Sequence, residues 1–440
     1  MIFKIYMYMK KIIFIVAAVV LALVACEKTP KNEPVEIKVS LAKDATAYQQ
    51  ADVTISLRDL NGSASYEAVT DETGTASFLV LPGLYEASAS FRYAGEGTLY
   101  LLNGINSNVT VSMGADNAFT IELAQSVSNQ LVIKEFYFGG CQKNDGSGTF
   151  QNDGYVILYN NSDYPADASD ICFAFATPSN SNVASKYLVD GELSYLAQGW
   201  IPAGWATWWF ENTVTIEPYS QIVISLFGAI NHTETYINSV DLSQADYAMY
   251  DPEVFANAKY VVSENIPSTN YLQTYAYAGG NAWPLSVNSP AFYMFRHDNA
   301  EAYTSDTANY DYTMGEKLPD AKIMTEWVVD GIEVFGAATM DKNGKRFPSS
   351  IDAGYVTFTN KQGYSVYRNV DKEATEAIAD NEGKLVYDYA GGTEDVEGST
   401  DPSGIDAERS IANGAKIVYL DSNNSTKDFH QRKYASLTGK

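Results

Sequence analysis

The sequence predicts an all-β protein with two domains of the sandwich type. Residues 35–125 alternate apolar and polar side chains with period two, which is typical of strands with one buried and one exposed face. After residue 128 the runs become almost continuously apolar, as in strands that are covered on both faces. Helical periodicity is weak, and the 440 residues are 46% hydrophobic and 13% aromatic, which is enough for packed cores.

Residues 1–25 have the pattern of a bacterial export signal. Two lysines precede an apolar run over residues 12–23, which is too short to span about 30 Å of hydrocarbon but suits a secretory signal. The following Leu23-Val24-Ala25-Cys26 resembles the lipobox of bacterial lipoproteins, which implies cleavage before Cys26 and attachment of membrane lipid to it. Residues 26–34 are then a polar tether. A transmembrane anchor and a plain secretory signal are the alternatives.

Residues 35–125 are expected to form the first domain, a β-sandwich. Val53, Ile55 and Leu57 alternate with polar residues, and glycine-containing turns separate such runs. Residues 70–78, followed by Leu81-Pro82-Gly83-Leu84-Tyr85, resemble the carboxypeptidase-regulatory-like fold, an immunoglobulin-like sandwich in which the Pro-Gly pair marks a hairpin. The resemblance implies a spacer or docking unit, and a ligand-binding unit is the alternative.

Residues 128–440 are expected to form the larger second domain. One short helix is predicted over residues 371–379, with Asp371 as its N-cap. Six segments, in this order along the chain, are similar to the lamin-tail domain, which is also an immunoglobulin-like sandwich: residues 131–138, 155–162, 215–224, 329–335, 364–368 and 421–429. Long insertions near 176–200 and 230–322 depart from that domain. A site specific to this chain is expected there, because sites tend to lie on loops held by a rigid scaffold.

The combination of these parts resembles a family of lipoproteins from gut-type Bacteroidetes. In that family a carboxypeptidase-regulatory-like domain precedes one long domain of unknown function with lamin-tail-like motifs. The resemblance covers essentially the whole chain after the signal. It implies a lipid-anchored protein of the cell envelope, located at the outer membrane and facing either side of it, and it implies no activity.

Two cysteines besides Cys26 raise the question of a disulfide. Cys141 and Cys172 both follow apolar runs that are predicted strands, and an envelope compartment permits disulfides. A bond between them would close a loop of about thirty residues and contribute roughly 3–4 kcal/mol in the chain-entropy model. The sequence favours this bond slightly over two buried free thiols.

Tryptophan is concentrated in one short segment, which makes that segment the candidate ligand-binding site. Four of the six tryptophans lie within ten residues: Trp200, Trp205, Trp208 and Trp209. Because neighbouring strand residues point to opposite faces, Trp208 and Trp209 cannot both enter one core. Exposed aromatic faces can stack on sugar rings or fill a protein interface. A large core lined by these rings is the alternative that we favour.

No catalytic pattern is recognisable, and no catalytic residue, metal or cofactor is assigned. The nucleophile elbow G-x-S-x-G, the zinc motif H-E-x-x-H and the Walker loop do not occur. His232, His297 and His430 lie in separate polar segments and are expected at the surface rather than around zinc. The acidic stretch 371–408 lacks the spacing of a calcium loop and is expected to be solvated.

The formal net charge of −25 argues against electrostatic binding of nucleic acid. We expect a lipid-anchored envelope protein without catalytic activity, which docks to an outer-membrane β-barrel transport receptor or holds the ligand of that receptor. The alternatives are a surface glycan-binding protein that uses residues 200–210, and a hydrolase whose site is built by the insertions.

Overall fold

A computed structural model of the chain describes residues 33–62, 64–95, 98–178, 185–190, 192–254, 256–278, 286–336, 345–396 and 398–438. The signal and Cys26 therefore lie outside the described residues. The chain divides into two units, one with Met1–Tyr93 and Tyr100–Val127, the other with Ala94–Leu99 and Ser128–Lys440. Strands dominate both units, so the predicted all-β class is confirmed. No helix among the described residues is long and apolar enough to cross a membrane.

The first unit is built from two sheets around one core. In the four-stranded sheet, β1 (Val35–Lys43) pairs antiparallel with β2 (Thr46–Ala47) and β5 (Thr75–Val80) and parallel with β8 (Ala118–Glu122). The second sheet has the order β4 (Ser65–Val69), β3 (Thr54–Asp59), β6 (Gly83–Gly95), β7 (Thr98–Val111) and β9 (Ala124–Asn129). Period-two alternation places Ile37, Val39, Ile55 and Leu57 in the core between them.

The glycine turn of the first unit forms as predicted, but the Pro82-Gly83 hairpin does not. Gly74 adopts φ 76°, and a Cβ at this position would lie 2.1 Å from the carbonyl oxygen of Tyr48, so only glycine fits. The predicted hairpin is wrong because β5 and β6, which flank Pro82-Gly83, belong to different sheets. This connection crosses from one layer of the sandwich to the other.

The second unit is centred on two six-stranded sheets. Sheet one has the order β22 (Tyr247–Ala248), β21 (Gln221–Ser225), β13 (Tyr155–Asn160), β10 (Leu131–Tyr137), β29 (Ser365–Arg368) and β30 (Phe429–Arg432). Sheet two has the order β23 (Gln273–Ala276), β19 (Ala206–Trp209), β15 (Ile171–Phe175), β24 (Ala291–Arg296), β27 (Val328–Gly336) and β28 (Val356–Phe358). The inner faces of both sheets contribute to one large core. Phe136 of sheet one stacks on Phe292 of sheet two, with ring centroids 5.0 Å apart.

A β-bulge in β10 controls which residues face this core. The register against β13 shifts between Ile133 and Glu135, so Lys134 is the extra residue. Ile133 and Phe136 both belong to the core, although they are three positions apart and would point to opposite faces of a regular strand. Lys134 and Glu135 are left to the outer side of sheet one, where both are fully buried.

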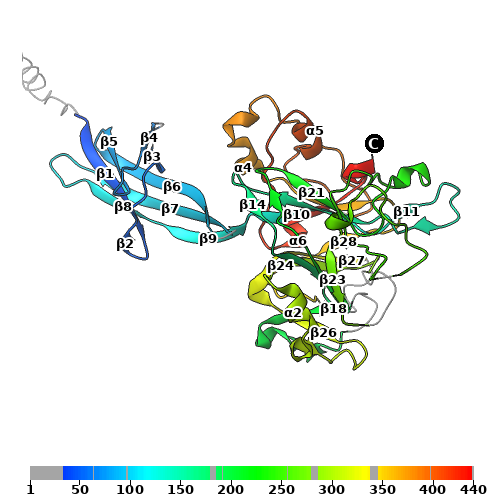
Figure 1. Cartoon of the computed structure of the whole chain (residues 1–440). Helices are drawn as coiled ribbons and strands as arrows, with labels where there is room; N and C mark the ends of the chain where they lie inside the picture. The colour runs from blue at the N-terminus through cyan, green and yellow to red at the C-terminus, as the bar shows by residue number, and fades with distance from the viewer. Residues whose placement is uncertain are drawn as a thin grey trace, which may run out of the picture. The chain divides into compact units, whose positions relative to one another are not determined.

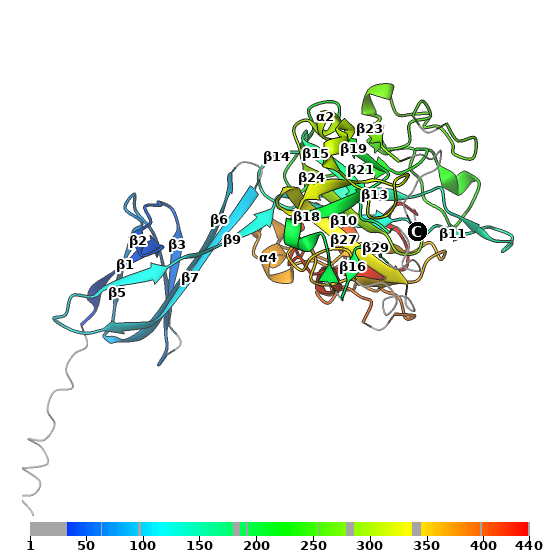
Figure 2. The ribbon, with the colours of Figure 1, turned by 90° about the horizontal axis from the view of Figure 1, so that it is seen from below.

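Both outer faces of the sandwich are covered, as the near-continuous apolar runs predict. Segments late in the chain, among them α5 (Ala407–Ala412), cover sheet one. A three-stranded sheet of β18 (Trp200–Gly204), β26 (Asp320–Met324) and β25 (Tyr310–Asp311) covers sheet two together with α2 (Ala300–Ser305). Figure 1 shows these layers of the second unit from α4 and α5 at the top to β18 and β26 at the bottom. Figure 2 views the same unit from the side of α2 and β18.

The remaining elements are short. Asp371 caps α4 (Lys372–Glu376) by accepting a hydrogen bond from the backbone N–H of Ala374 at 3.0 Å, so the predicted helix and its cap are confirmed. Among the described residues, the short α-helices α2, α5 and α6 (Ser425–Asp428) were not predicted. Three two-stranded pairs complete the strands: β11 (Cys141–Gln142) with β12 (Thr149–Phe150), β14 (Ala166–Asp167) with β20 (Thr215–Ile216), and β16 (Leu188–Val189) with β17 (Glu192–Leu193).

Candidate functional site

The four clustered tryptophans do not form an exposed aromatic surface. Trp208 is 1% exposed in the core of the sandwich, and Trp200 is 3% exposed in the core between sheet two and its covering layer. Trp205 and Trp209 are half-buried and pack against these two cores respectively. The hypothesis of an exposed aromatic surface is wrong because both faces of sheet two are covered. Neighbouring rings on a strand of this sheet therefore point into two different cores, and neither points into solvent. Trp200 and Trp208 are core residues, as the alternative interpretation predicts.

Trp209 lines a pocket, which we name the Trp209 pocket. Its volume is about 520 Å³, and four segments contribute: residues 169–170, 209–211, 273–274 and 297–301. Strand pairing explains why they meet. Trp209 lies opposite Cys172 and Gln273, and Ile171 lies opposite Arg296, so all four segments reach the same end of sheet two. Trp209 and Phe210 supply the aromatic part of the lining.

Carboxylates dominate the polar part of the Trp209 pocket. Glu211, Asp298 and Glu301 are exposed at its edge, and Glu211 accepts a hydrogen bond from the side-chain amide of Gln273 at 3.4 Å. A fourth carboxylate, that of Asp170, is paired with Arg296. The pocket therefore combines an aromatic face with hydrogen-bonding groups and an excess of negative charge.

His297 lines the same pocket as a neutral imidazole. Its Nδ1 accepts a hydrogen bond from the backbone N–H of Asn299 at 3.0 Å, which leaves the ring proton on Nε2. The ring packs against Tyr303 and Trp327, with centroid distances of 4.9 and 5.0 Å. Burial is the main cause that lowers the pKa of His297 below its usual 6.5. At neutral pH the ring therefore contributes an N–H donor and no charge.

The hydroxyl group of Ser169 is not arranged as a nucleophile. Ser169 lines the pocket, but its Oγ donates to Asp167 at 2.6 Å and accepts from the backbone N–H of Val214 at 2.9 Å. It is thus engaged in closing a turn rather than paired with His297, and a Ser-His couple of the hydrolytic kind is missing from this pocket.

The histidine prediction is wrong for two of the three residues. His232 and His430 are each 3% exposed rather than at the surface. The Nδ1–H of His430 donates to Asn369 Oδ1 at 2.7 Å, its Nε2 faces the hydroxyl of Tyr389, and burial lowers the pKa of His430 to about 3. Within the described residues, no three His, Cys, Asp or Glu side chains are placed to hold a metal ion.

The predicted Cys141–Cys172 disulfide is not formed. Both thiols are free and buried. Cys172 lies on the outer face of sheet two, whereas Cys141 lies near Tyr137 on the outer side of sheet one, so the sandwich separates them. Burial raises the pKa of the Cys141 thiol to about 12, which makes it unreactive.

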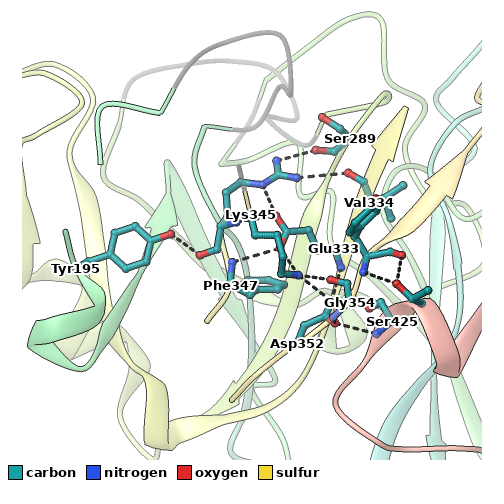
Figure 3. A network of polar contacts seen from close by, with 12 residues as sticks. Tyr195, Ser289, Glu333, Val334, Lys345, Phe347, Asp352, Gly354 and Ser425 are labelled. Carbon is teal, nitrogen blue, oxygen red and sulfur yellow. Dashed lines mark hydrogen bonds and ion pairs between the residues drawn. The ribbon is translucent and has the colours of Figure 1, made fainter. Parts of the chain in front are cut away.

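A second cluster of ionisable groups lies inside the second unit, between β27 and residues 345–354 (Figure 3). Glu333, which is fully buried, accepts hydrogen bonds from Arg346 Nε at 3.0 Å and lies 3.1 Å from Lys345 Nζ. Arg346 also donates to the carbonyl oxygens of Ser289 at 2.8 Å and Pro178 at 3.0 Å. These bonds connect four separate segments of chain, at residues 178, 289, 333 and 345–346.

Asp352 completes this cluster from the other side. Its carboxylate accepts hydrogen bonds from the backbone N–H of Gly354 at 2.8 Å and from both the N–H at 2.8 Å and the hydroxyl at 2.6 Å of Ser425. Two carboxylates thus face two cations, and the polar groups satisfy one another. We interpret the cluster as a structural network that holds residues 345–354 against β27 and α6.

The acidic stretch 371–408 is only partly the solvated loop that was predicted. Asp401 is buried and accepts hydrogen bonds from the backbone N–H groups of Val370 at 2.9 Å and Ser403 at 2.8 Å. Glu408 pairs with the fully buried Lys134 at 2.7 Å. Burial raises the pKa of Glu408, but Lys134 outweighs it and holds that pKa at about 2. Two of the carboxylates are therefore structural.

Sequence reasoning found one member of the pocket and missed the others. Trp209 was a candidate because tryptophan is rare and clustered. Gln273, His297 and Glu301 lie in the insertion near 230–322 where a site is expected, but no pattern singled them out. Glu211 carried no signal. These residues lie in segments far apart in the sequence that only strand pairing brings together. The charge pattern offered no signal either, since acidic residues are frequent throughout the chain.

Fold and pocket together define an all-β protein of the sandwich class. Residues 217–403 match the model of a family described as protein of unknown function (DUF4876). A crystal structure of a DUF4876 family protein from Bacteroides thetaiotaomicron is similar over 90% of this chain and 95% of that chain, with a TM-score of 0.56 and 22% identity. At this identity the likeness shows the fold alone. The expected similarity to a Bacteroidetes family of unknown function is thereby supported, and its lipoprotein and carboxypeptidase-regulatory parts stay predictions.

A DUF3823 family protein from Parabacteroides merdae aligns with 34% of this chain and 69% of that chain, at a TM-score of 0.15 and 10% identity. These values are too low to define a shared fold. No curated protein sequence matches the chain.

Proposed function

We propose that this protein is a lipid-anchored, non-catalytic recognition protein of the cell envelope that holds a carbohydrate in the Trp209 pocket. The observation that carries the proposal is the half-buried ring of Trp209 beside hydrogen-bonding side chains in a cavity of about 520 Å³. That volume falls within the range of about 300–1,000 Å³ that is usual for small-molecule sites.

The chemistry of the lining supports a sugar ring as the ligand. A pyranose has an apolar face of C–H groups that packs on an aromatic ring, and hydroxyl groups at its edge that need both donors and acceptors. Trp209 supplies the aromatic face. The Nε2–H of His297 and the amide of Gln273 supply donors, and Glu211 supplies acceptors. A purely apolar ligand would leave these polar groups without partners.

The envelope location rests on the N-terminal sequence. The lipobox-like segment ending at Cys26 supports lipid anchoring, and the polar tether supports display of both units away from the membrane. A recognition protein placed in this way is suited to pass its ligand to an outer-membrane β-barrel receptor. Alternatively, the same pocket binds a glycan at the cell surface without passing it to a receptor.

The absence of a pairing between Ser169 and His297 supports binding over hydrolysis. Ser169 is held by Asp167 and Val214, and His297 is held by Asn299. A hydrolase built on the carboxylates of the pocket is the competing hypothesis. Hydrolysis of any bound saccharide by the purified protein would establish the hydrolase hypothesis.

The test is a glycan array with the lipid-free mature protein, followed by titration of each hit against Trp209→Ala. We expect at least one saccharide to bind and the substitution to weaken it about tenfold or more, because it removes the stacking face. Trp205→Ala is the matched control, since Trp205 is equally half-buried but packs against the other core. Unchanged affinity in Trp209→Ala, or an array without hits, would contradict the proposal.

A further inference from the structure

We propose that the saccharide held in the Trp209 pocket carries a positive charge, as a protonated amino sugar does. This inference rests on the proposed function and specifies the class of its ligand. It follows from which charged groups line the pocket, how each of them is paired, and what the aromatic ring adds.

The pocket is lined by carboxylates without a lining cation. Asp170, Glu211, Asp298 and Glu301 contribute to it, and no lysine or arginine among the described residues does. The chain as a whole has 54 acidic and 29 basic residues, so some acidic excess is expected anywhere on its surface. Four acidic residues and no basic one make the described lining more acidic than the average composition of the chain.

Only one of the four carboxylates has a cationic partner. Arg296 pairs with Asp170. Among the described residues Glu211 and Glu301 form no ion pair, and Asp298 has only His297, whose Nδ1 lies 4.0 Å away. Because burial lowers the pKa of His297 and its Nδ1 accepts a backbone hydrogen bond, the ring is neutral and does not offset Asp298. Three negative charges thus remain at the edge of the pocket.

The aromatic ring and the carboxylates favour the same kind of ligand. An ammonium group over the face of an indole is attracted by the electrons of the ring, more strongly where water is excluded. Carboxylates nearby add attraction for a cation and repel an anion. The pocket therefore favours an amino sugar, accepts a neutral sugar more weakly, and disfavours a uronic acid or a sulfated sugar.

The experiment compares three oligosaccharides of equal length by calorimetric titration of the full mature protein. The probes are an oligomer of glucosamine, its N-acetylated counterpart, and an oligomer of galacturonic acid. A mildly acidic buffer keeps the ring amines protonated while exposed carboxyl groups stay ionised. We expect the glucosamine oligomer to bind about tenfold tighter than the N-acetylated one. Added salt should narrow this difference, and the galacturonic acid oligomer should not bind.

Charge-neutralising variants test whether the carboxylates of the pocket cause the preference for the glucosamine oligomer. Glu211→Gln combined with Glu301→Gln should reduce the ratio of the two affinities, glucosamine oligomer over N-acetylated oligomer, several-fold. Glu253→Gln is the control, because Glu253 is exposed and does not line the pocket. All of these side chains are exposed, so the variants are expected to fold normally.

The outcomes separate this inference from the proposed function. Equal binding of the charged and neutral oligomers, with no effect of the glutamine variants, would overturn the charge preference and leave carbohydrate binding intact. Tightest binding of the galacturonic acid oligomer would overturn it as well. A linear polyamine that binds as tightly as the glucosamine oligomer would overturn the assignment to a sugar. Failure of all three oligosaccharides to bind would remove both proposals.

Discussion

At the scale of single residues, two neighbouring tryptophans show how position on a strand decides a role. Trp208 and Trp209 follow each other in β19, so their rings point to opposite faces of sheet two. Trp208 enters the sandwich core, and Trp209 reaches the covering layer and the pocket beside it. A shift of one residue in this strand would exchange the two rings and abolish the pocket as described.

Asp320 is a second residue whose surroundings decide its behaviour. It is 1% exposed, and it accepts hydrogen bonds from Thr177 Oγ1 and the Tyr187 hydroxyl, each at 2.8 Å. Among the described residues it has no cationic partner, and the carboxylate of Asp311 contacts the same tyrosine hydroxyl at 3.0 Å. Burial is the main cause that raises the pKa of Asp320 from 3.8 to about 7.

This raised pKa predicts a specific pH dependence of stability. Between pH 3.8 and about pH 7 the folded state keeps a proton on Asp320 that the unfolded state releases, so stability falls as pH rises through this window. The full effect is about 4 kcal/mol for a shift of this size. Asp320→Asn can accept both hydrogen bonds without a charge. It should therefore match the wild type at about pH 4 and exceed it in stability at about pH 8.

Urea unfolding of wild type and Asp320→Asn at these two pH values measures the effect. Asp388→Asn serves as the control, because Asp388 is exposed. If the free energy of unfolding changes equally between the two pH values for wild type and Asp320→Asn, then Asp320 does not titrate as described.

At the scale of elements, the bulge in β10 determines which residues of this strand face the core of the sandwich and which face its covering layer. The extra residue Lys134 keeps Leu131 and Ile133 on the same inner face as Phe136 and Phe138. It also places its own ammonium group on the outer side, about 6 Å from the ring centroids of Tyr159, Tyr367 and Tyr419 and in contact with Glu408. The bulge therefore serves the apolar register as well as an ion pair.

Two variants distinguish the contribution of the β10 register from that of the Lys134 charge. Deletion of Lys134 would move Leu131 and Ile133 to the outer face, and we expect the second unit not to fold, as judged by circular dichroism and solubility. Lys134→Met keeps the extra residue and removes the buried charge. Because the Glu408 side chain is 28% exposed and can be hydrated, this variant should change the free energy of unfolding by only about 1–2 kcal/mol.

Comparison of the two variants decides which property matters. A deletion variant as stable as Lys134→Met would mean that the register of β10 adjusts without the bulge. Severe destabilisation of Lys134→Met alone would mean that the ion pair with Glu408, rather than the register, holds this part of the sheet.

At the scale of the whole molecule, each unit has a hydrophobic core of its own. Cys26 precedes both units and lies outside the described residues. The lipobox-like segment predicts that Cys26→Ser moves the protein from the membrane fraction to the soluble fraction of cells, because the lipid is the proposed anchor. Fractionation followed by immunoblotting measures this. Cys141→Ser is the matched control and should stay with the membranes, since Cys141 is a buried thiol of the second unit. Persistence of Cys26→Ser in the membrane fraction would point to another anchor.

Much of the strand pattern was predictable from sequence, because it depends on local alternation. Val53, Ile55 and Leu57 are buried as their period predicts, and the apolar runs that begin at Leu131, Tyr155 and Ile171 are strands covered on both sides. The helix cap at Asp371 was also predictable, since capping is a local hydrogen bond. The Pro82-Gly83 connection was not, because a turn motif does not specify whether the next strand stays in the same sheet.

The sequence by itself determined the all-β class, the position of most core strands and the segment in which the tryptophans cluster. These depend on periodicity, residue shape and local hydrogen bonding, which operate over a few neighbouring residues. Only the tertiary structure decided that Trp208 is core and Trp209 lines a pocket, that Cys141 and Cys172 stay apart, and that Glu211, Gln273 and His297 share one site. Each of these depends on which strands pair and which layer covers them. Contacts between residues distant in sequence set that arrangement, and no local pattern encodes it.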